Sequence, residues 1–392
     1  MSPKDRTPAE PAASGDAALP ADEFASEGQR GLPPPPKGVL GVLIRDQSIV
    51  VPVISLVAAF LVGALLIRWQ GVNPTYAYNS LFSYSFLTSD GLTATFAKMV
   101  PLILCGLAVV IPLRVGLFNI GAQGQFMAGA ISAAAAAYAL GDAPGIVLVL
   151  VAMAVAVLGG FIWASVASLL KTSRGVHEVI STIMLNSVAA GLIDWLINGP
   201  LKDPKQPYPS THPVPEQAQL TPLGVVPIGL PIALVLAAAV AWMLHRTTLG
   251  FQFETVGRNK FAASYAGISI GTMVILAMGF AGMLAGLSGA IELLEIAPYR
   301  YQSGIAGSLG FDGITIALLA RGNPIGTIPA ALLVGAMRAG AAKLMFDTGI
   351  QPEIVDMLLA ITLLFVSLPI VAKLLFRRYA AQGATLASSW GS

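Results

Sequence analysis

Long runs of apolar residues, separated by short polar breaks, follow one another along most of the chain. A run of about 17–25 apolar residues is long enough to cross a bilayer as a helix. The eighth run is interrupted by glycines and by Asp312. The pattern therefore predicts an all-α, polytopic membrane protein with about ten transmembrane helices, at about 49–67, 97–113, 118–140, 145–169, 179–197, 226–245, 271–292, 305–320, 325–343 and 354–373.

The composition agrees with a membrane protein. Hydrophobic residues make up 55% of the 392 positions and charged residues only 11%, whereas a soluble domain carries about 25% charged residues. The net charge of +2 gives no indication of a nucleic-acid partner, and the single cysteine, Cys105, excludes an intrachain disulfide. Residues 1–40 are rich in proline, alanine, glycine and acids and contain no apolar region, which predicts a disordered cytoplasmic tail. We expect a permease-sized membrane domain at 41–376 and a second cytoplasmic tail at 377–392.

The lysines and arginines predict the orientation. With ten spans, 15 of the 22 lie on the side of the amino terminus and seven, Arg338 among them, on the other side. Because cytoplasmic loops carry the excess of basic residues, both termini are predicted to be cytoplasmic.

Two connections between spans are long. The external loop at about 198–225 has six prolines among its first eighteen residues and cannot be helical throughout. The cytoplasmic loop at about 246–270 contains the small, apolar stretch FAASYAGI, which Asn259 can cap at its start and Gly267 at its end. This pattern predicts a short helix that either docks into a groove of another protein or lies on the lipid headgroups.

The stretch GLFNIGAQGQFMAGA, residues 116–130, places amides in an apolar run. An amide without a partner in hydrocarbon costs about 1–3 kcal/mol, so the segment is expected to avoid lipid. If it is helical throughout, 100° per residue places Asn119, Gln123 and Phe126 on one face. The other face would carry mainly small residues for helix packing, namely Gly121, Gly124 and Ala128, together with Gln125. The amides then either line a solute path or bond neighbouring helices together.

Two further stripes have helical spacing. Glu178, Thr182 and Asn186 follow one another at four-residue intervals in the fifth run, and Asn186 is the deepest, so we assign it to the solute path. The seventh run repeats glycine at 279, 282, 286 and 289, and small residues at this spacing let two helix backbones approach closely. Gly282 and Gly286 are therefore predicted to pack against another helix, either as a static contact or as a sliding one.

Several functions are disfavoured by what the sequence lacks. The acidic residues of the predicted spans lie at or near span ends, which argues against ion coupling. There is no phosphate-binding loop, no zinc-binding helix motif and no nucleophile motif. We predict no catalytic residue, no metal site and no cofactor in this chain.

Several segments together resemble one family. PLILCGLAVVIPLRVGLFNIGAQGQFMAGA, HEVISTIMLN, VGRNKFAASYAGIS, GFAGMLAGLSGA and GFDGITIALLARGNPIGTIPAALLVGAM resemble, in this order, the permease subunits of bacterial ABC importers for nucleosides and simple sugars, within the broader branched-chain amino acid and ribose permease group. The resemblance runs from about residue 95 to 372. A glutamate is commoner in the family where this chain has Gln123, so the sequence departs there.

The resemblance implies an assembly in the bacterial cytoplasmic (inner) membrane. Its expected partners are a second, similar permease in a heterodimer, two cytoplasmic ATPase subunits that bind the ATP, and an external solute-binding protein. The family's coupling loop corresponds to the stretch around Val256 to Ser269, and its expected coupling residues are Gly257, Asn259, Ala262, Ala263, Tyr265 and Gly267. A nucleoside is the first choice of cargo and a pentose or other simple sugar the second. An ion-driven secondary transporter and a passive channel are the remaining alternatives.

Overall fold

The computed structural model describes residues 47–367, and the two predicted tails lie outside them, as do the last residues of the tenth run. The chain divides at Val50, and the contacts given below lie in the unit that begins at Val51. Among the described residues the regular elements are all helical: α3 (Gln47–Trp69), α4 (Pro74–Leu87), α5 (Ser89–Arg114), α6 (Ala122–Leu140), α7 (Gly145–Arg174), α8 (Glu178–Asn198), η1 (Glu216–Ala218), α9 (Gly229–Arg246), α10 (Thr248–Arg258), α11 (Lys260–Tyr265), α12 (Ile270–Glu295), α13 (Leu309–Leu319), α14 (Thr327–Thr348) and α15 (Glu353–Ser367). The chain is therefore all-helical, as predicted.

Six of these helices, namely α5, α7, α8, α9, α12 and α14, are long and apolar enough to cross a membrane, and a seventh span results if the bent pair α3–α4 is counted as one. Each of the ten predicted runs contains a helix. However, α13 has only 11 residues, and α6, whose first turns carry two glutamines, is not among the six. The fold is that of a multi-pass membrane protein.

Helix α4 was not predicted. Pro74 occupies its first turn, and the Asn73 side chain accepts a hydrogen bond from Thr75 N, so the helix has an ordinary N-terminal cap. Its tyrosines and serines interrupt the apolar pattern from which the spans were predicted. The chain bends by 117° between α3 and α4.

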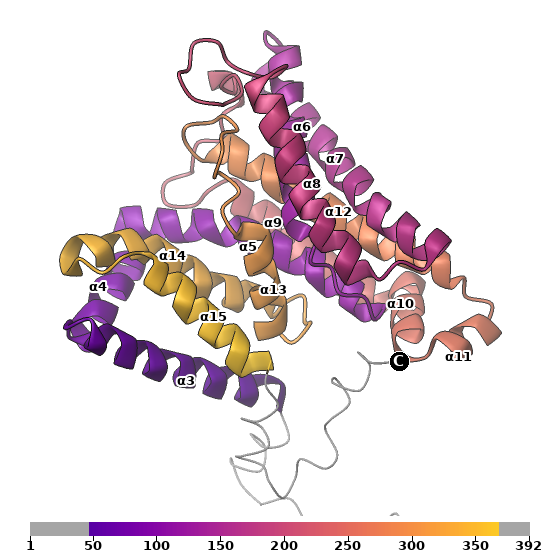
Figure 1. The fold of residues 1–392 in the computed structure, drawn as a ribbon, viewed down its shortest axis with the longest axis horizontal. Helices are drawn as coiled ribbons and strands as arrows, with labels where there is room; N and C mark the ends of the chain where they lie inside the picture. The colour runs from indigo at the N-terminus through magenta and orange to yellow at the C-terminus, as the bar shows by residue number, and fades with distance from the viewer. Residues whose placement is uncertain (1–46, 368–392) are drawn as a thin grey trace, which may run out of the picture. The chain divides into compact units, whose positions relative to one another are not determined.

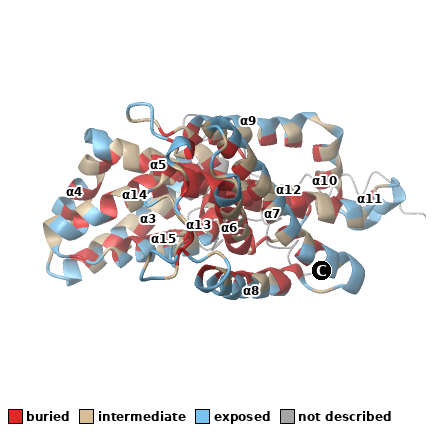
Figure 2. Cartoon of the chain, turned by 90° about the horizontal axis from the view of Figure 1, so that it is seen from above, coloured by how far each residue is buried: buried red, intermediate tan, exposed pale blue. Residues whose placement is uncertain are grey.

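Helix α5 forms the centre of the core. It packs against α9, α12, α13 and α14, and buried residues gather on it in Figure 2. The most apolar 18-residue stretch of α5 is 83% buried. The corresponding stretch of α7 has a higher mean hydropathy but is only 22% buried. Apolar residues that are exposed on α7, such as Leu158 and Ile162, therefore form a surface suited to lipid.

Helices α6, α7 and α12 run together in one part of the bundle (Figure 1), and they pack closely through glycines. A Cβ built on Gly282 of α12 would lie 2.2 Å from the carbonyl oxygen of Gly160 in α7, and one built on Gly286 would lie 2.3 Å from that of Ala156. Gly286 also contacts α6: a Cβ built on Gly129 would lie 2.3 Å from the Cα of Gly286. These positions leave no room for a side chain.

The connections gather at two ends of the bundle. The stretch 199–228 is non-helical apart from η1, as its prolines predicted. It is hydrogen-bonded to the segment after α12: Thr211 N donates to Tyr301 O at 2.9 Å, and Val214 N donates to Tyr299 O at 2.7 Å. At the other end, the Arg114 side chain donates to Gly322 O at 2.8 Å, and Gly257 lies against the Arg114 carbonyl. Connections predicted to lie on the same side of the membrane thus contact one another.

Candidate functional site

Helix α6 does not begin where the sequence pattern predicted. Residues 115–121 form no helix, and α6 starts at Ala122, because the chain turns back at Gly116 with φ +75°. Asn119 Nδ2 donates to Ala108 O at 3.2 Å, and Ala108 lies six residues before the end of α5. At 1.5 Å per residue, this places Asn119 about 9 Å inside that end. The chain therefore re-enters the bundle before α6 begins.

The helical faces predicted for 116–130 are wrong for Asn119. Asn119 Nδ2 donates to Gln125 Oε1 at 3.0 Å, and Gln125 Nε2 donates to Asn119 Oδ1 at 3.1 Å, although the two residues were predicted to lie on opposite faces. Helical spacing does not extend to Asn119, because it lies in the turn before α6. Its Oδ1 also accepts from Gly121 N at 3.0 Å. The two buried amides thus form a reciprocal pair.

Asn186 of α8 bonds to the backbone at the start of α6. Gly124 N donates to Asn186 Oδ1 at 2.8 Å, and Asn186 Nδ2 donates to Ile120 O at 3.0 Å. A Cβ built on Gly124 would lie 2.9 Å from Asn186 Oδ1, and one built on Gly121 would lie 3.0 Å from Thr182 Cβ. The absence of side chains at both glycines allows α8 to approach this closely.

Gln123 bonds in the same way to the start of α13. Gly310 N donates to Gln123 Oε1 at 2.8 Å, and Gln123 Nε2 donates to Gly307 O at 2.9 Å. A Cβ built on Gly310 would lie 2.3 Å from Gln123 Cα, so the two backbones are in contact. Phe126 is buried one turn further along α6, where its carbonyl lies against Gly289. The amino-terminal ends of α6 and α13 therefore meet inside the bundle.

This meeting point explains why the segment carries amides. The first N–H groups of a helix have no partner within the helix, and in a membrane protein water cannot satisfy them all. Side-chain oxygens accept from Gly121, Gly124 and Gly310 N–H groups here, and the amide nitrogens satisfy nearby carbonyls. The four residues predicted to line a solute path, Asn119, Gln123, Phe126 and Asn186, are 0%, 5%, 0% and 7% exposed, so all four are buried inside the protein.

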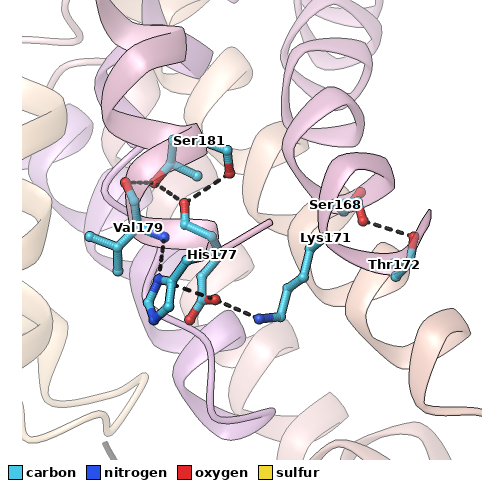
Figure 3. Close-up of polar contacts among 8 residues, drawn as sticks. Ser168, Lys171, Thr172, His177, Val179 and Ser181 are labelled. Atoms are coloured by element: carbon cyan, nitrogen blue, oxygen red, sulfur yellow. Dashed lines mark hydrogen bonds and ion pairs between the residues drawn. The ribbon is translucent and has the colours of Figure 1, made fainter. Parts of the chain in front are cut away.

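The start of α8 is fixed to α7 by an ion pair (Figure 3). Lys171 Nζ lies 2.5 Å from Glu178 Oε2, and His177 Nδ1 accepts from Val179 N at 3.3 Å. Glu178, Thr182 and Asn186 share the buried face of α8, as their spacing predicted. The ion pair and this buried face fix the position of the Asn186 amide.

The loop at 246–270 holds two helices rather than one. Helix α10 was not predicted, whereas α11 begins after Asn259, whose Oδ1 accepts from Ala262 N at 3.0 Å, and the chain leaves it through Gly267 at φ +78°. Phe261 and Tyr265 of α11 are 81% and 94% exposed. Ala262 is also exposed, but Ala263 is fully buried against the chain itself.

The charge cluster around Arg338 was among the ion pairs that were not predicted from the sequence. Arg338 was counted with the external residues, but it lies in the middle of α14, where its Nη2 is 2.5 Å from Asp312 Oδ2 of α13 and 3.1 Å from Asp356 Oδ1 of α15. The signal was available, because Arg338 falls within the ninth predicted run and a cation there needs a carboxylate partner. No group of three His, Cys, Asp or Glu residues in the described range is arranged to hold a metal ion.

Comparisons with known proteins identify the family. Residues 91–367 match the family described as "Branched-chain amino acid transport system / permease component". The guanosine ABC transporter permease protein NupP of Bacillus subtilis is 31% identical over 345 residues, which cover 87% of this chain and 99% of NupP. The glucose ABC transporter permease protein TsgB13 of Haloferax volcanii is 31% identical over 341 residues, covering 84% of this chain and 88% of TsgB13. A second guanosine ABC transporter permease protein of Bacillus subtilis, NupQ, is 26% identical over 251 residues, covering 62% of this chain and 78% of NupQ.

The resemblance noted in the sequence is thus confirmed. The matched residues include the start of α6, all of α8 and the segment from α10 to α14. The chain belongs to this family of permease components and is the multi-pass membrane subunit of an ABC importer, a transport subunit rather than an enzyme.

Proposed function

We propose that this chain forms the translocation path for a nucleoside, which an external solute-binding protein delivers and which separate ATPase subunits drive inward. The observation that carries the proposal is the meeting of the α6 and α13 amino-terminal ends inside the bundle, joined by Gln123. Transporters commonly build their solute sites where discontinuous helices begin near the middle of the membrane. Nucleosides are favoured as cargo because NupP and NupQ are named for guanosine.

The solute path is proposed to open beside Asn119, Gln123, Phe126 and Asn186. Amide groups can exchange their backbone partners for ribose hydroxyls or base edges, and an aromatic ring can cover the apolar face of a base. Because these residues are buried in the described conformation, solute passage requires the starts of α6, α8 and α13 to separate. Gln125, Gly121, Gly124, Gly282 and Gly286 are proposed to keep the surrounding helices packed.

The membrane topology is proposed to comprise ten spans with both termini in the cytoplasm. Loops predicted to be external contact one another, as do loops predicted to be cytoplasmic. Because Arg338 lies within α14, it no longer counts with the external basic residues, which strengthens the charge asymmetry. We place the chain in the bacterial cytoplasmic membrane, with residues 41–376 as the permease domain.

The proposed partners are a second, different permease and two ATPase subunits. The similarity of this chain to both NupP and NupQ of one organism supports a heterodimer. The ATPase is proposed to bind the exposed side of α11, formed by Phe261, Ala262 and Tyr265. Gly257, Asn259, Ala263 and Gly267 would support that surface from within, because they cap α11, end it or pack beneath it.

A simple sugar is the second candidate cargo. TsgB13, which is named for glucose, is as identical to this chain as NupP is. The test is ligand binding by the solute-binding protein encoded beside this chain, measured by calorimetry with guanosine, ribose and glucose. Binding of guanosine in preference to both sugars supports a nucleoside importer, and binding of a sugar alone assigns the second candidate.

Two other transport classes make different predictions. An ion-driven carrier would maintain uptake without ATP as long as the ion gradient is intact. A channel would pass solute through the purified chain alone. Uptake that stops when ATP is removed, with the gradient maintained, excludes both.

A further inference from the structure

The segment 304–310 leads from α12 into α13 as a series of glycine-containing turns. Gly304 and Gly307 have φ of +92° and +43°, a region that glycine enters without steric cost. Ile305 N donates to Gln302 O at 3.2 Å and Gly307 N to Gly304 O at 3.0 Å, so the segment is a succession of turns. Its end, Gly310, contacts the start of α6.

Two side chains hold this segment from different helices. Gln123 of α6 bonds Gly307 O and Gly310 N, as described above. Arg338 of α14 donates from Nη2 to Ser308 Oγ at 2.8 Å and pairs with Asp312 in the first turn of α13. Ser308 in turn donates to Asp312 Oδ1 at 3.3 Å. The segment is thus fixed on one side by an amide and on the other by a charged group.

The position of Arg338 is costly for a helix that crosses a membrane. A charged residue there is expensive unless it is paired, and such residues commonly serve transport. Nη2 contacts oxygens of Ser308, Asp312 and Asp356, whereas Nε is buried and has no partner among the described residues. On its other sides α14 packs through small residues, with Gly335 against α5 and Gly340 against α4. Arg338 therefore lies on the side of α14 that faces α13 and α15, away from the contacts with α4 and α5.

We propose that Arg338 is a positioning residue for transport: through Ser308 and Asp312 it holds the 304–310 segment closed over the start of α6, opposite Gln123. The segment opens when these bonds break, and α13 moves with it. This inference rests on the proposed path at the meeting of α6 and α13. A static role in folding would instead loosen the whole bundle when Arg338 is replaced.

The test measures the accessibility of the segment directly. Ala306, which is 4% exposed, is replaced by cysteine in a Cys105→Ala background, and the complete complex is treated with a small, water-soluble methanethiosulfonate reagent. Arg338→Gln is expected to speed labelling at position 306 several-fold. The matched control is Ala233→Cys in α9, which is 0% exposed and distant in sequence from the segment, and its labelling rate is expected not to change.

Two further variants keep the proposal testable. Asp312→Asn removes the other half of the ion pair and should give the same acceleration, and the double variant should add nothing to either single one. Arg338→Lys keeps the positive charge, so its labelling rate at position 306 should lie between those of the wild type and Arg338→Gln. If the Arg338→Gln protein is not produced in sufficient amount, Arg338→Lys is used in its place. Uptake per assembled complex should fall in each variant while ATP hydrolysis without solute is maintained.

Equal acceleration at 306 and 233 would overturn the proposal in favour of a purely structural role. An unchanged rate at 306 would overturn it as well, because the segment would then be held without Arg338. The labelling needs no cargo, so it remains interpretable if the wild-type complex proves not to carry nucleosides.

Discussion

At the scale of single residues, the central feature is a set of amides that replace missing backbone partners. Asn119, Gln123 and Asn186 each bond one backbone N–H and one backbone carbonyl; these groups lie near the start of α6 or α13, except Ala108 O in the last turns of α5. Inside a membrane protein such groups have few alternatives, so losing one side chain leaves several polar groups unpaired.

The Asn119–Gln125 pair should behave as one unit. Asn119→Ala removes both side-chain bonds of the buried Gln125 amide and should cost about 1–3 kcal/mol of stability, whereas Gln125→Ala leaves Asn119 bonded to Ala108 O and Gly121 N and should cost less. The double variant should be destabilised by less than the sum of the single variants, because the second substitution removes the group left unpaired. Thermal unfolding of the detergent-solubilised chain measures this, with Asn198→Ala, an exposed amide at the end of α8, as the control. Additive losses would show that the two amides do not act together.

Gln123 should matter more for transport than for assembly. Gln123→Ala removes the bonds between α6 and the 304–310 segment, and each net hydrogen bond contributes about 0.5–1.5 kcal/mol. We expect uptake per complex to fall several-fold while the amount of assembled complex changes little. Gln123→Glu tests the residue type commoner in the family and should retain more activity than the alanine. Full uptake by Gln123→Ala would remove this residue from the proposed path.

At the scale of helices, backbone contact through glycine sets the geometry. Gly282→Ala or Gly286→Ala places a methyl group within about 2.3 Å of a carbonyl oxygen of α7, so the helices must move apart. We expect reduced assembly and a lower unfolding temperature. Gly191→Ala is the matched control, because nothing lies within 4 Å of its built Cβ, and it should be neutral or slightly stabilising. Normal assembly of both α12 variants would contradict this packing.

Helix α11 should bind through its aromatic residues. Phe261→Ala and Tyr265→Ala remove exposed rings, and aromatic residues commonly dominate the binding energy of an interface, at about 2 kcal/mol or more each. We expect weaker capture of the ATPase and less solute-stimulated ATP hydrolysis, with membrane insertion unchanged. Tyr208→Ala, in the loop 199–228, is the control. Should both α11 variants hydrolyse ATP normally, the ATPase binds elsewhere.

The helices were largely predictable, and α7, α8 and α12 begin within one residue of the predicted runs, but the start of α6 was not predictable. Apolar runs predicted most spans, because burial in lipid needs length and hydrophobicity alone. The pattern could not place the start of α6 at Ala122, since a turn held by distant partners looks like a polar interruption of a helix. It identified Asn119, Gln123, Gln125 and Asn186 as unusual, yet their partners depend on how α5, α8 and α13 pack. The position of Arg338 within the ninth run indicated that it needs a carboxylate partner, but the identity of that partner, Asp312, depends on packing in the same way.

At the scale of the whole molecule, these features describe a transport subunit that depends on others. The described helices contain no nucleotide-binding motif, while α11 presents two exposed rings at the end of the bundle opposite the loop 199–228. Permease components of this family work with separate ATPases, and we expect the energy that these supply to reach the meeting point of α6 and α13. We expect the coupling to run through α10 and α12, which flank α11, because α10 packs on α9 and α5, and α12 packs on α5, α6 and α7.

The most direct test of this account is uptake of labelled guanosine into proteoliposomes that contain the chain with its second permease, ATPase and solute-binding protein. We predict uptake that requires ATP and the binding protein, that is competed by unlabelled nucleosides and not by glucose, and that is absent when this chain is reconstituted alone. Transport of glucose but not guanosine would contradict the assigned cargo. ATP-independent passage through the chain by itself would contradict the importer.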